Sequence, residues 1–484
     1  MTRITRREML RLSVLSGLGA ALAACAPAPT AAPTQAPASA ATAAPQATEA
    51  ATAAPQATEA ATAAPAAAAL KPADLQYYIG FGAGGNPDQV EAVKKIFARF
   101  SEANKGVTVE PLVVAWADAP QKFQAMAAAG TPPDVITMGM SQWDFAAKGS
   151  FVDIQPFLDA NKIDTSDWDP IAMECYTVKP KNNLLYGLPF GINAEIGIYN
   201  KTIWDAAGLK AATDWKDATW TWDALLANAQ KTTKSSGSNV TQFGMLRTPG
   251  DWDIPWMFGG SWVSEDGQHI TVGAPESIKA FTFVQDEVFK QHVAPTAAES
   301  QALTNGFLSG QVGYLDDGTW SINTYLEIQD FEWDFCPVPF AQEVGVDKGR
   351  ATPYYPDSLV ISSKNNVDQS WALVKFMLLD SDDNYKEFMQ LMSEVPARKS
   401  FRSWYYDQFW KGKAPNKNWS IVENCWGYAQ IQRLFLSINW SELNNTQAAD
   451  LGALWTNDST PDKVIPALAT KLEDIWQRGL AQLK

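Results

Sequence analysis

The sequence contains few of the residues that carry most enzyme and metal chemistry. Histidine occurs only as His269 and His292, and the four cysteines show no C-x-x-C spacing. Zinc sites and nucleophile–base relays need several such side chains in defined arrangements. We therefore expect a protein that is not an enzyme, with no metal site and no cofactor.

Positive charge is also scarce. Lysine and arginine number 38 against 53 aspartates and glutamates, which gives a net charge of −15 and a pI near 4.7. Without a basic patch, neither nucleic acid nor an anionic surface is an expected partner. Tryptophan, in contrast, is abundant, with 20 residues. Its flat apolar face and single N–H donor suit core packing and also stacking against sugar rings.

Long apolar runs are missing. The longest near the N-terminus, Leu12 to Ala24, is too short to span a bilayer and follows Arg3, Arg6, Arg7 and Arg11. This pattern is typical of an export signal, which we place at 1–24. The stretch Thr5 to Arg11 also resembles a twin-arginine signal, but ordinary secretory signals carry paired arginines too, so both routes stay open.

The signal ends in Leu22-Ala23-Ala24-Cys25, which resembles a bacterial lipobox. The resemblance implies that Cys25 carries a lipid and becomes the new N-terminus; the alternative is an unmodified cysteine in a signal cut elsewhere. Residues 25–70 are mostly Ala, Pro, Thr and Gln, which cannot form a core and predict a disordered spacer. We expect an extracytoplasmic protein that is held to the cell membrane by its lipid.

Cys175, Cys336 and Cys425 remain in the folded part. Their odd number favours buried thiols, although a disulfide between two of them stays open in an exported protein.

From Asp74 onwards, strand and helix patterns alternate. Strands are predicted at 75–82, 107–114 and 133–138, and helices from Pro87 to before Gly106 and at 120–129. This β-α-β-α-β order indicates an α/β fold with a parallel sheet and helices on both faces. Ligands of such sheets bind at the carboxyl ends of the strands, here 80–85, 115–118 and 139–143.

The glycine-rich stretch "GFGAGGNP" lies at the first of these ends. Its spacing is not G-x-G-x-x-G, and no acidic residue follows the second strand, so nucleotide binding is disfavoured. We interpret it as a flexible turn that lets the backbone approach a ligand.

Several motifs in the expected order carry a family resemblance. They are "PPDVITMGMSQWDFAAKGSFVDIQPFLD", "YGLPFGINAEIGIYNKTIWDAAGL", "TWTWDALLANAQ", "FLSGQVGYLDDGTW", "PDSLVISSKNNVDQSWALVKFML" and "VPARKS". Together they resemble the extracellular solute-binding proteins of family 1, the maltose-binding-protein-like receptors of ABC importers. The resemblance covers roughly Leu75 to Lys484.

The resemblance implies a two-lobe periplasmic-binding-protein-like fold with a central ligand cleft and hinge strands. Carried over, lobe one comprises 71–192 plus 324–381, and lobe two 193–323 plus 382–484. The implied function is capture of a small-molecule carbohydrate by hinge closure and delivery to ABC transporter permease subunits. We expect a monomer.

Sugar recognition needs flat aromatic faces and planar polar groups, and candidates follow strand ends or lie in loops. They are Trp116, Asp118, Ser141, Gln142, Tyr355 and Asp357 in lobe one, and Asn193, Trp252, Trp256, Trp320 and Trp426 in lobe two. The family pattern implies a stacking role for Trp320 and adds Arg398, at a position that faces the cleft. Tyr354 and Tyr355 point to opposite sides if they share a strand, and we choose Tyr355.

Structural roles without ligand contact stay open for some of these residues. Trp256 also fits a helix core, and Asp118 also fits a solvated charge at a helix N-terminus. The aromatic residues of "SWYYDQFW", Ser403 to Trp410, fit either a cleft lining or a cap.

Alternative functions are an exported glycoside hydrolase, an adhesion protein, or a receptor for a peptide, polyamine or glycerol phosphate. A hydrolase needs two carboxyl groups that converge in the cleft, which the Asp316-Asp317 and Asp382-Asp383 pairs do not guarantee. The sequence does not reveal which sugar binds.

Overall fold

The computed structural model describes residues 70–81, 84–237, 239–303, 306–362 and 365–484. They belong to a unit that spans Thr62–Lys484, whereas a separate unit, Met1–Ala61, lies outside the described residues. The predicted export signal, Cys25, nearly all of the 25–70 spacer, and Gly82 and Ala83 of the glycine-rich turn therefore also lie outside them.

The larger sheet of the described chain has six strands in the order β14-β6-β13-β3-β1-β2. Its strands are β1 (Ala73–Phe81), β2 (Val107–Val113), β3 (Val135–Gly139), β6 (Gly187–Asn193), β13 (Tyr355–Ile361) and β14 (Val395–Pro396). β1 pairs in parallel with β2 and β3, which confirms the prediction for this segment. The sheet as a whole is mixed, because β13 runs antiparallel to β3 and β6. The alternating pattern could not foresee this, since β13 enters from a distant part of the chain.

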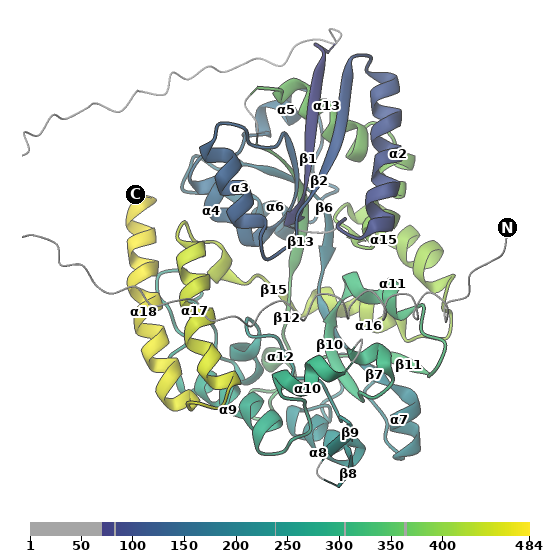
Figure 1. The fold of residues 1–484 in the computed structure, drawn as a ribbon, viewed down its shortest axis with the longest axis vertical. Helices are drawn as coiled ribbons and strands as arrows, with labels where there is room; N and C mark the ends of the chain where they lie inside the picture. The colour runs from purple at the N-terminus through teal and green to yellow at the C-terminus, as the bar shows by residue number, and fades with distance from the viewer. Residues whose placement is uncertain (1–69, 82–83, 238, 304–305, 363–364) are drawn as a thin grey trace, which may run out of the picture. The chain divides into compact units, whose positions relative to one another are not determined.

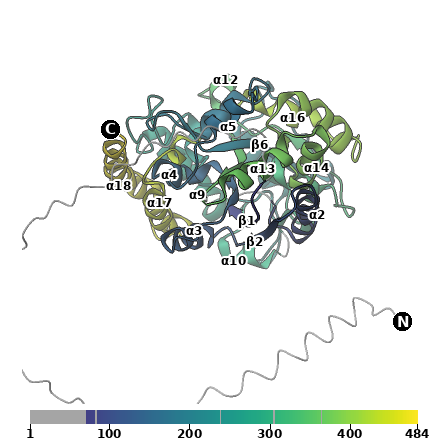
Figure 2. The same cartoon turned by 90° about the horizontal axis from the view of Figure 1, so that it is seen from above.

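Helices cover both faces of this sheet (Figures 1 and 2). On one face lie α2 (Pro87–Ala103), α13 (Val367–Leu378) and α14 (Asp382–Met392), which pack against one another. On the other face lie α3 (Ala119–Ala128) and α4 (Trp143–Ala147). There the ring of Phe123 packs 6.0 Å from that of Phe81 and 4.9 Å from that of Phe145, centroid to centroid. Further elements nearby are α5 (Gln155–Ala160), α6 (Pro170–Cys175), β4 (Thr177–Val178) and β5 (Leu184–Leu185).

Helix α2 shows how local sequence fixes an element. Pro87 occupies the first turn, where its missing N–H costs nothing, and the backbone N–H of Asn86 donates to Gln89 Oε1 at 3.2 Å. The predicted apolar face is buried at Val93, Ile96, Phe97 and Phe100. Packing of this face fastens the helix to the sheet.

A second, three-stranded antiparallel sheet has the order β10-β7-β11. Its strands are β7 (Glu195–Asn200), β10 (Tyr314–Gly318) and β11 (Trp333–Cys336). The helices of this part are α7 (Lys201–Ala206), α8 (Trp222–Thr232), α9 (Pro275–Phe289), α10 (Ala297–Ala302), α11 (Ile322–Tyr325), α12 (Val346–Gly349), α16 (Trp419–Asn424), α17 (Trp440–Trp455) and α18 (Pro461–Gln482), with a hairpin of β8 (Lys234–Ser236) and β9 (Asn239–Gln242). α17 and α18 pack side by side, and α18 also contacts α9 (Figure 1).

The chain passes from one sheet to the other at two places. β6 ends at Asn193 and β7 begins at Glu195; later, β12 (Thr352–Pro353), which pairs with β15 (Ala429–Gln430), leads directly into β13. The hydroxyl of Thr352 joins the two passages, because it accepts from the Glu195 backbone N–H at 2.9 Å and donates to the Glu195 carbonyl at 2.6 Å. These passages match the crossing strands that the resemblance implies.

Strand pairing departs from the predicted lobe limits in two places. β11 pairs in the second sheet although 324–381 was assigned to lobe one, and β14 pairs in the first sheet although 382–484 was assigned to lobe two. Backbone pairing between distant segments decides these memberships, and sequence position alone does not. The other lobe limits stay a prediction.

The three cysteines of the described chain, Cys175, Cys336 and Cys425, are buried and free. This confirms their interpretation as buried thiols. Within the same residues, no helix combines the length and the apolar character needed to cross a membrane.

We predict that Thr352→Val destabilises the fold. The side chain is completely buried, and the substitution leaves both polar backbone groups of Glu195 without the hydroxyl that satisfies them. Unsatisfied buried groups cost about 1–3 kcal/mol of unfolding free energy each. Denaturant unfolding measures the loss, with Thr241→Val, which removes an exposed hydroxyl bound to the Lys234 carbonyl, as the control. Equal losses for the two variants would contradict the prediction.

Candidate functional site

A cavity of about 1000 Å³ opens at the carboxyl ends of the parallel strands. Its wall on this side consists of Ile79–Phe81 at the end of β1, Val113–Trp116 at the end of β2 and just after it, and Gly139–Gln142 at the end of β3 and just after it. These are the strand ends at which the sequence predicted ligand binding. The volume is at the upper end of the range for small-molecule sites, about 300–1,000 Å³, so an oligosaccharide-sized ligand has room.

The other wall of the cavity is aromatic. Trp252, Trp320, Tyr355, Phe435 and Trp440 line it in a continuous row of ring contacts. Ring centroids are 5.1 Å apart between Trp252 and Trp440, and 4.6 Å between Trp440 and Phe435. Tyr355 lies 6.2 Å from Phe435 and 6.0 Å from Trp320. Phe435 and Trp440 are buried, but Trp320 remains 40% exposed at the end of the row.

Close approach to a glycine fixes the ring of Trp320. A Cβ atom on Gly318 would lie 2.1 Å from the indole, so the ring lies directly over the glycine backbone. On the sheet side of the cavity, Trp116 is 58% exposed. The cavity therefore carries an exposed indole on two of its walls.

Polar side chains of the cavity are positioned by neighbouring elements. Asn193 is buried at the end of β6, and its Oδ1 accepts from the Thr319 hydroxyl at 2.9 Å. Gln89 at the start of α2 donates to the Leu391 carbonyl at 2.9 Å, and Gln142 donates to the Ser141 hydroxyl at 3.0 Å. These contacts hold planar amides at the wall before any ligand binds.

Two carboxyl groups meet in the same wall. Asp357 lies on β13, and Glu394 lies immediately before β14 with only 1% of its surface exposed. Burial, and then the neighbouring carboxylate of Asp357, raises the pKa of Glu394 well above its ordinary value, while a hydrogen bond with Asn193 lowers it. The surroundings of Glu394 therefore favour its protonated form.

The family model of the bacterial extracellular solute-binding proteins matches residues 84–383, well over half of the chain. The chain belongs to this family. It is 24% identical over 323 residues to a Brucella abortus (strain 2308) chain named as a binding protein, in an alignment that covers 64% of this chain and 72% of that one.

Solved structures of low sequence identity share the fold of this solute-binding protein. An ABC substrate-binding protein from Listeria monocytogenes, in complex with cycloalternan, has a TM-score of 0.70 and 22% identity over 85% of this chain and 100% of that one. The GacH receptor of Streptomyces glaucescens, solved unliganded and with acarbose, has a TM-score of 0.66 and 20% identity, covering 84% and 98%. These likenesses confirm the predicted two-lobe α/β fold.

Most residues predicted to bind ligand in this solute-binding protein line the large cavity. They are Trp116, Ser141, Gln142, Asn193, Trp252, Trp320, Tyr355 and Asp357. Of the two neighbouring tyrosines, Tyr355, the one chosen from the sequence, lines the cavity. Tyr354 is buried away from it, with its ring centroid 6.1 Å from that of Trp426.

Four predicted residues lie outside this cavity. Asp118 is exposed just before α3, and Trp256 is buried in the wall of a second cavity. Arg398 forms an ion pair with Asp167, 3.2 Å from Nε to Oδ2, and its guanidinium lies over the ring of Phe401. Trp426 donates to the Tyr406 hydroxyl at 2.9 Å. Internal partners already occupy Arg398 and Trp426.

The aromatic stretch Ser403 to Trp410 contributes no side chain to the cavity. It lies in α15 (Arg402–Trp404) and the π-helix η6 (Tyr405–Lys411), where Tyr405, Tyr406 and Trp410 are buried. The Trp410 ring stacks on Trp419 at 5.7 Å. Of the two alternatives, lining and capping, the structure therefore excludes lining.

Sequence reasoning missed part of the wall. The cavity is also lined by Asn86, Gln89, Met392, Glu394, Phe435, Trp440 and Asn444. Asn86 and Gln89 follow the glycine-rich turn that was expected to approach a ligand, so their position offered a signal. Phe435 and Trp440 lie near the start of α17, far from any predicted strand end, and no local pattern marked them.

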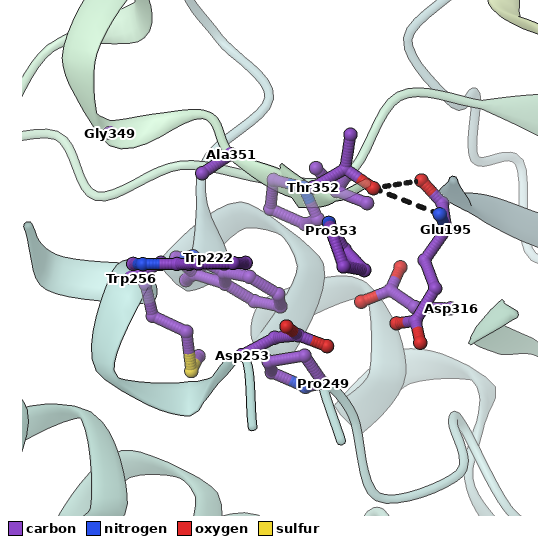
Figure 3. A pocket seen from close by; sticks show the side chains of 13 residues that line it. Glu195, Trp222, Pro249, Asp253, Trp256, Asp316, Gly349, Ala351, Thr352 and Pro353 are labelled. Carbon is purple, nitrogen blue, oxygen red and sulfur yellow. Dashed lines mark hydrogen bonds between the residues drawn. The ribbon is translucent and has the colours of Figure 1, made fainter. Parts of the chain in front are cut away.

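A second, much smaller cavity of about 10 Å³, the space of one water molecule, lies near the crossing strands. Figure 3 shows the carboxyl groups of Glu195, Asp253 and Asp316 directed toward it, with Trp222, Trp256 and prolines around them. No group of His, Cys, Asp or Glu side chains in the described ranges has the arrangement of a metal site.

Burial governs the charge of this acidic cluster. It raises the pKa of Glu195 well above its ordinary value, and the carboxylates of Asp253, Asp316 and Asp317 raise it further. Burial also raises the pKa of Asp316 to about 6, against the lowering effect of hydrogen bonds from Tyr314 and Thr248; the Thr248 hydroxyl lies 2.7 Å from Oδ2. The folded state thus binds these protons more tightly than the unfolded chain does.

We predict a pH-dependent contribution of Asp316 to stability. Because its pKa is raised to about 6 in the fold, its stabilising proton is fully bound below the ordinary value of 3.8 and is lost as the pH rises through 6. The stability of the wild type relative to Asp316→Asn should fall by up to about 3 kcal/mol between about pH 4 and pH 7. Denaturant unfolding at several pH values measures this difference.

The slope, and not the absolute stability of the variant, is the decisive quantity, because the amide also alters two hydrogen bonds. The exposed Asp330→Asn serves as the matched control and should change the slope little. Parallel pH profiles for the wild type and Asp316→Asn would refute the assignment.

Proposed function

We propose that this solute-binding protein captures a sugar or short oligosaccharide outside the cytoplasm and delivers it, unmodified, to the permease of an ABC importer. The single observation that carries the proposal is the exposure of two indole faces at the cavity. Trp116 and Trp320 are 58% and 40% exposed, and both line it.

Exposed large apolar side chains are few in the described chain and concentrate at the cavity. They are Val113, Trp116, Leu308 and Trp320, and all except Leu308 line it. Leaving such a side chain in water forgoes about 1.5–3 kcal/mol of burial free energy. A ligand with a flat apolar face, such as the C–H face of a pyranose, recovers this free energy when it covers the indoles.

The polar lining suits hydroxyl groups. Planar amides of Asn86, Gln89, Gln142, Asn193 and Asn444 and the carboxyl group of Asp357 offer both donors and acceptors. No lysine, arginine or histidine occurs among the described residues that line the cavity, which disfavours phosphates and carboxylates. Structural neighbours that were solved with cycloalternan and acarbose support the same ligand class.

The cavity wall combines both parts of the fold. Trp116 and Ser141 follow strands of the first sheet, whereas Trp320 follows β10 of the second sheet. A ligand that touches both walls has higher affinity for the closed arrangement and so favours closure. The passages at Asn193–Glu195 and Thr352–Tyr355 are the segments about which we propose that closure occurs.

Membrane attachment through a lipid on Cys25 completes the proposal. Tethering through the spacer that the sequence predicts at 25–70 raises the local concentration of the receptor near its permease. The family is extracellular, so a location outside the cytoplasm is consistent with the membership of this chain in the family.

The test is a ligand screen on the purified protein. Thermal-shift measurements with mono- and oligosaccharides identify candidates, and calorimetry then determines stoichiometry and affinity. Binding of one ligand per chain without turnover supports the proposal. Hydrolysis of the bound sugar, or binding of peptides or polyamines with no sugar among the ligands, would sink it.

Trp320→Ala should weaken sugar binding by about tenfold or more, because it removes one stacking face. Leu308→Ala is the matched control, since Leu308 is 39% exposed but lies outside the cavity lining. Calorimetric titration of both variants with the sugar identified in the screen measures the effect. Unchanged affinity in Trp320→Ala would show that this indole does not stack on the ligand.

Cys25→Ala should release the protein from the membrane fraction of the producing cells, because the side chain that carries the lipid is removed. Cell fractionation and labelling with a radioactive fatty acid measure the change. Cys175→Ala, which alters a buried thiol of the fold, should keep both the label and the membrane location. Persistence of Cys25→Ala in the membrane fraction would contradict lipid anchoring at this residue.

A further inference from the structure

Asp357 and Glu394 form a pair of carboxyl groups in the cavity wall. One of them is a buried acid, which the binding of a neutral sugar does not require. Glu394 is 99% buried, since only 1% of its surface is exposed, and its Oε2 atom has no hydrogen-bond partner in the part of the chain that the structure describes. A Cβ atom on Gly191 would lie 2.0 Å from this oxygen, so the glycine makes the space that the carboxyl group occupies. The fold therefore admits a buried acid at the ligand site and leaves part of its bonding capacity unused.

Among the described residues, no positively charged side chain compensates the charge of Glu394. The groups that act on it are the Asp357 carboxylate, which adds to the effect of burial, and the Asn193 amide. Tyr405 of η6 is the other titratable group that interacts with it in the described part of the chain. A neighbouring carboxylate disfavours ionisation of Glu394, so the pair binds a proton more tightly than an isolated carboxyl group does.

The cavity as a whole is electrostatically negative. Its described lining contains Asp357 and Glu394 but no basic side chain, and the chain carries a net charge of −15. Negative charge that lines a concave site attracts and concentrates cations. An ammonium group is the cation that supplies several donors in a small volume and can replace a proton between two carboxylates.

We propose that the ligand is an amino sugar, or a short oligosaccharide that contains one, whose ammonium group binds Asp357 and Glu394. The inference rests on the proposed sugar-binding function. The exposed indoles of Trp116 and Trp320 favour a pyranose over a flexible polyamine, because a linear amine has no ring face to cover them.

Binding of the ammonium group changes the number of protons on the carboxyl pair. The ligand enters with its amine protonated, and the ammonium hydrogens then bond to the two carboxylates. The proton held by Glu394 leaves to solvent, so binding releases about one proton per ligand at a pH where both the pair and the amine are protonated.

The experiment compares matched ligands on the full chain by calorimetry at about pH 6. Glucosamine and its β-1,4-linked dimer and trimer are the amine probes; glucose, cellobiose and cellotriose present a hydroxyl in place of each amine. We expect the best amine probe to bind about tenfold tighter or more than its neutral counterpart. Titrations in buffers with different ionisation enthalpies measure the released proton.

Variants show whether the amine preference comes from the Asp357–Glu394 pair or from the negative charge of the protein in general. Glu394→Gln removes the titrating carboxyl group and should lose both the proton release and most of the amine preference. Glu287→Gln is the control, because Glu287 is an equally buried carboxyl group outside the cavity lining, and it should retain both. Should Glu394→Gln fail to fold, the wild-type preference and proton release still decide the question.

Each outcome bears on one proposal or on both. Equal or tighter binding of the neutral probes refutes the amine inference and leaves sugar binding intact. Tighter binding of spermidine than of every sugar refutes the amino-sugar ligand and favours a polyamine receptor. Binding of none of these probes, together with failure of the wider sugar screen, overturns the proposed function itself.

Discussion

The bond between the two passages of the chain is the contact on which the rest of the structure depends. Thr352 satisfies both the N–H and the carbonyl of Glu195, across 157 positions of sequence. Close by, the Thr319 backbone N–H donates to the Ala194 carbonyl at 2.9 Å, and the Thr319 hydroxyl donates to Asn193. These bonds lie where the chain passes between the two sheets, and Trp116 and Trp320 follow strands of different sheets, so the geometry of the passages determines how the two indoles can face one ligand.

Buried and half-buried acids flank these passages on both sides. Asp357 lies on β13 of the first sheet and Glu394 immediately precedes its strand β14, whereas Glu195, Asp253 and Asp316 surround the small cavity beside the second sheet. Tyr355 lies between the groups, and its pKa is raised by burial and then by the charges of Asp253 and Glu195. Clustered carboxyl groups and exposed indole rings both lower the stability of the fold. Proteins retain such features mainly where function needs them. Their position at the hinge and cavity agrees with a receptor whose ligand supplies the missing contacts.

Local pattern predicted the regular part of the fold well. The α2 helix and the strands β1, β2 and β3 follow from periodicity, capping residues and glycine positions, and the strand-end rule then led to Trp116, Ser141 and Gln142. Arg398, which the family pattern supplied, and Trp426 lie outside the cavity lining, and polar partners within the fold occupy both side chains. Nothing local predicted Phe435 or Trp440, which reach the cavity only through the packing of the C-terminal segment.

The sequence by itself determined the family, the alternation of strands and helices at 73–139, and the residue types at the carboxyl ends of the first strands. These properties depend on local spacing and composition, which a single chain displays directly. Only the tertiary structure decided the antiparallel entry of β13, the exchange of β11 and β14 between the predicted lobes, and the meeting of Glu394 with Asp357. Each of these depends on contacts between segments far apart in the chain, whose free energy is set by burial and pairing partners that no local pattern encodes.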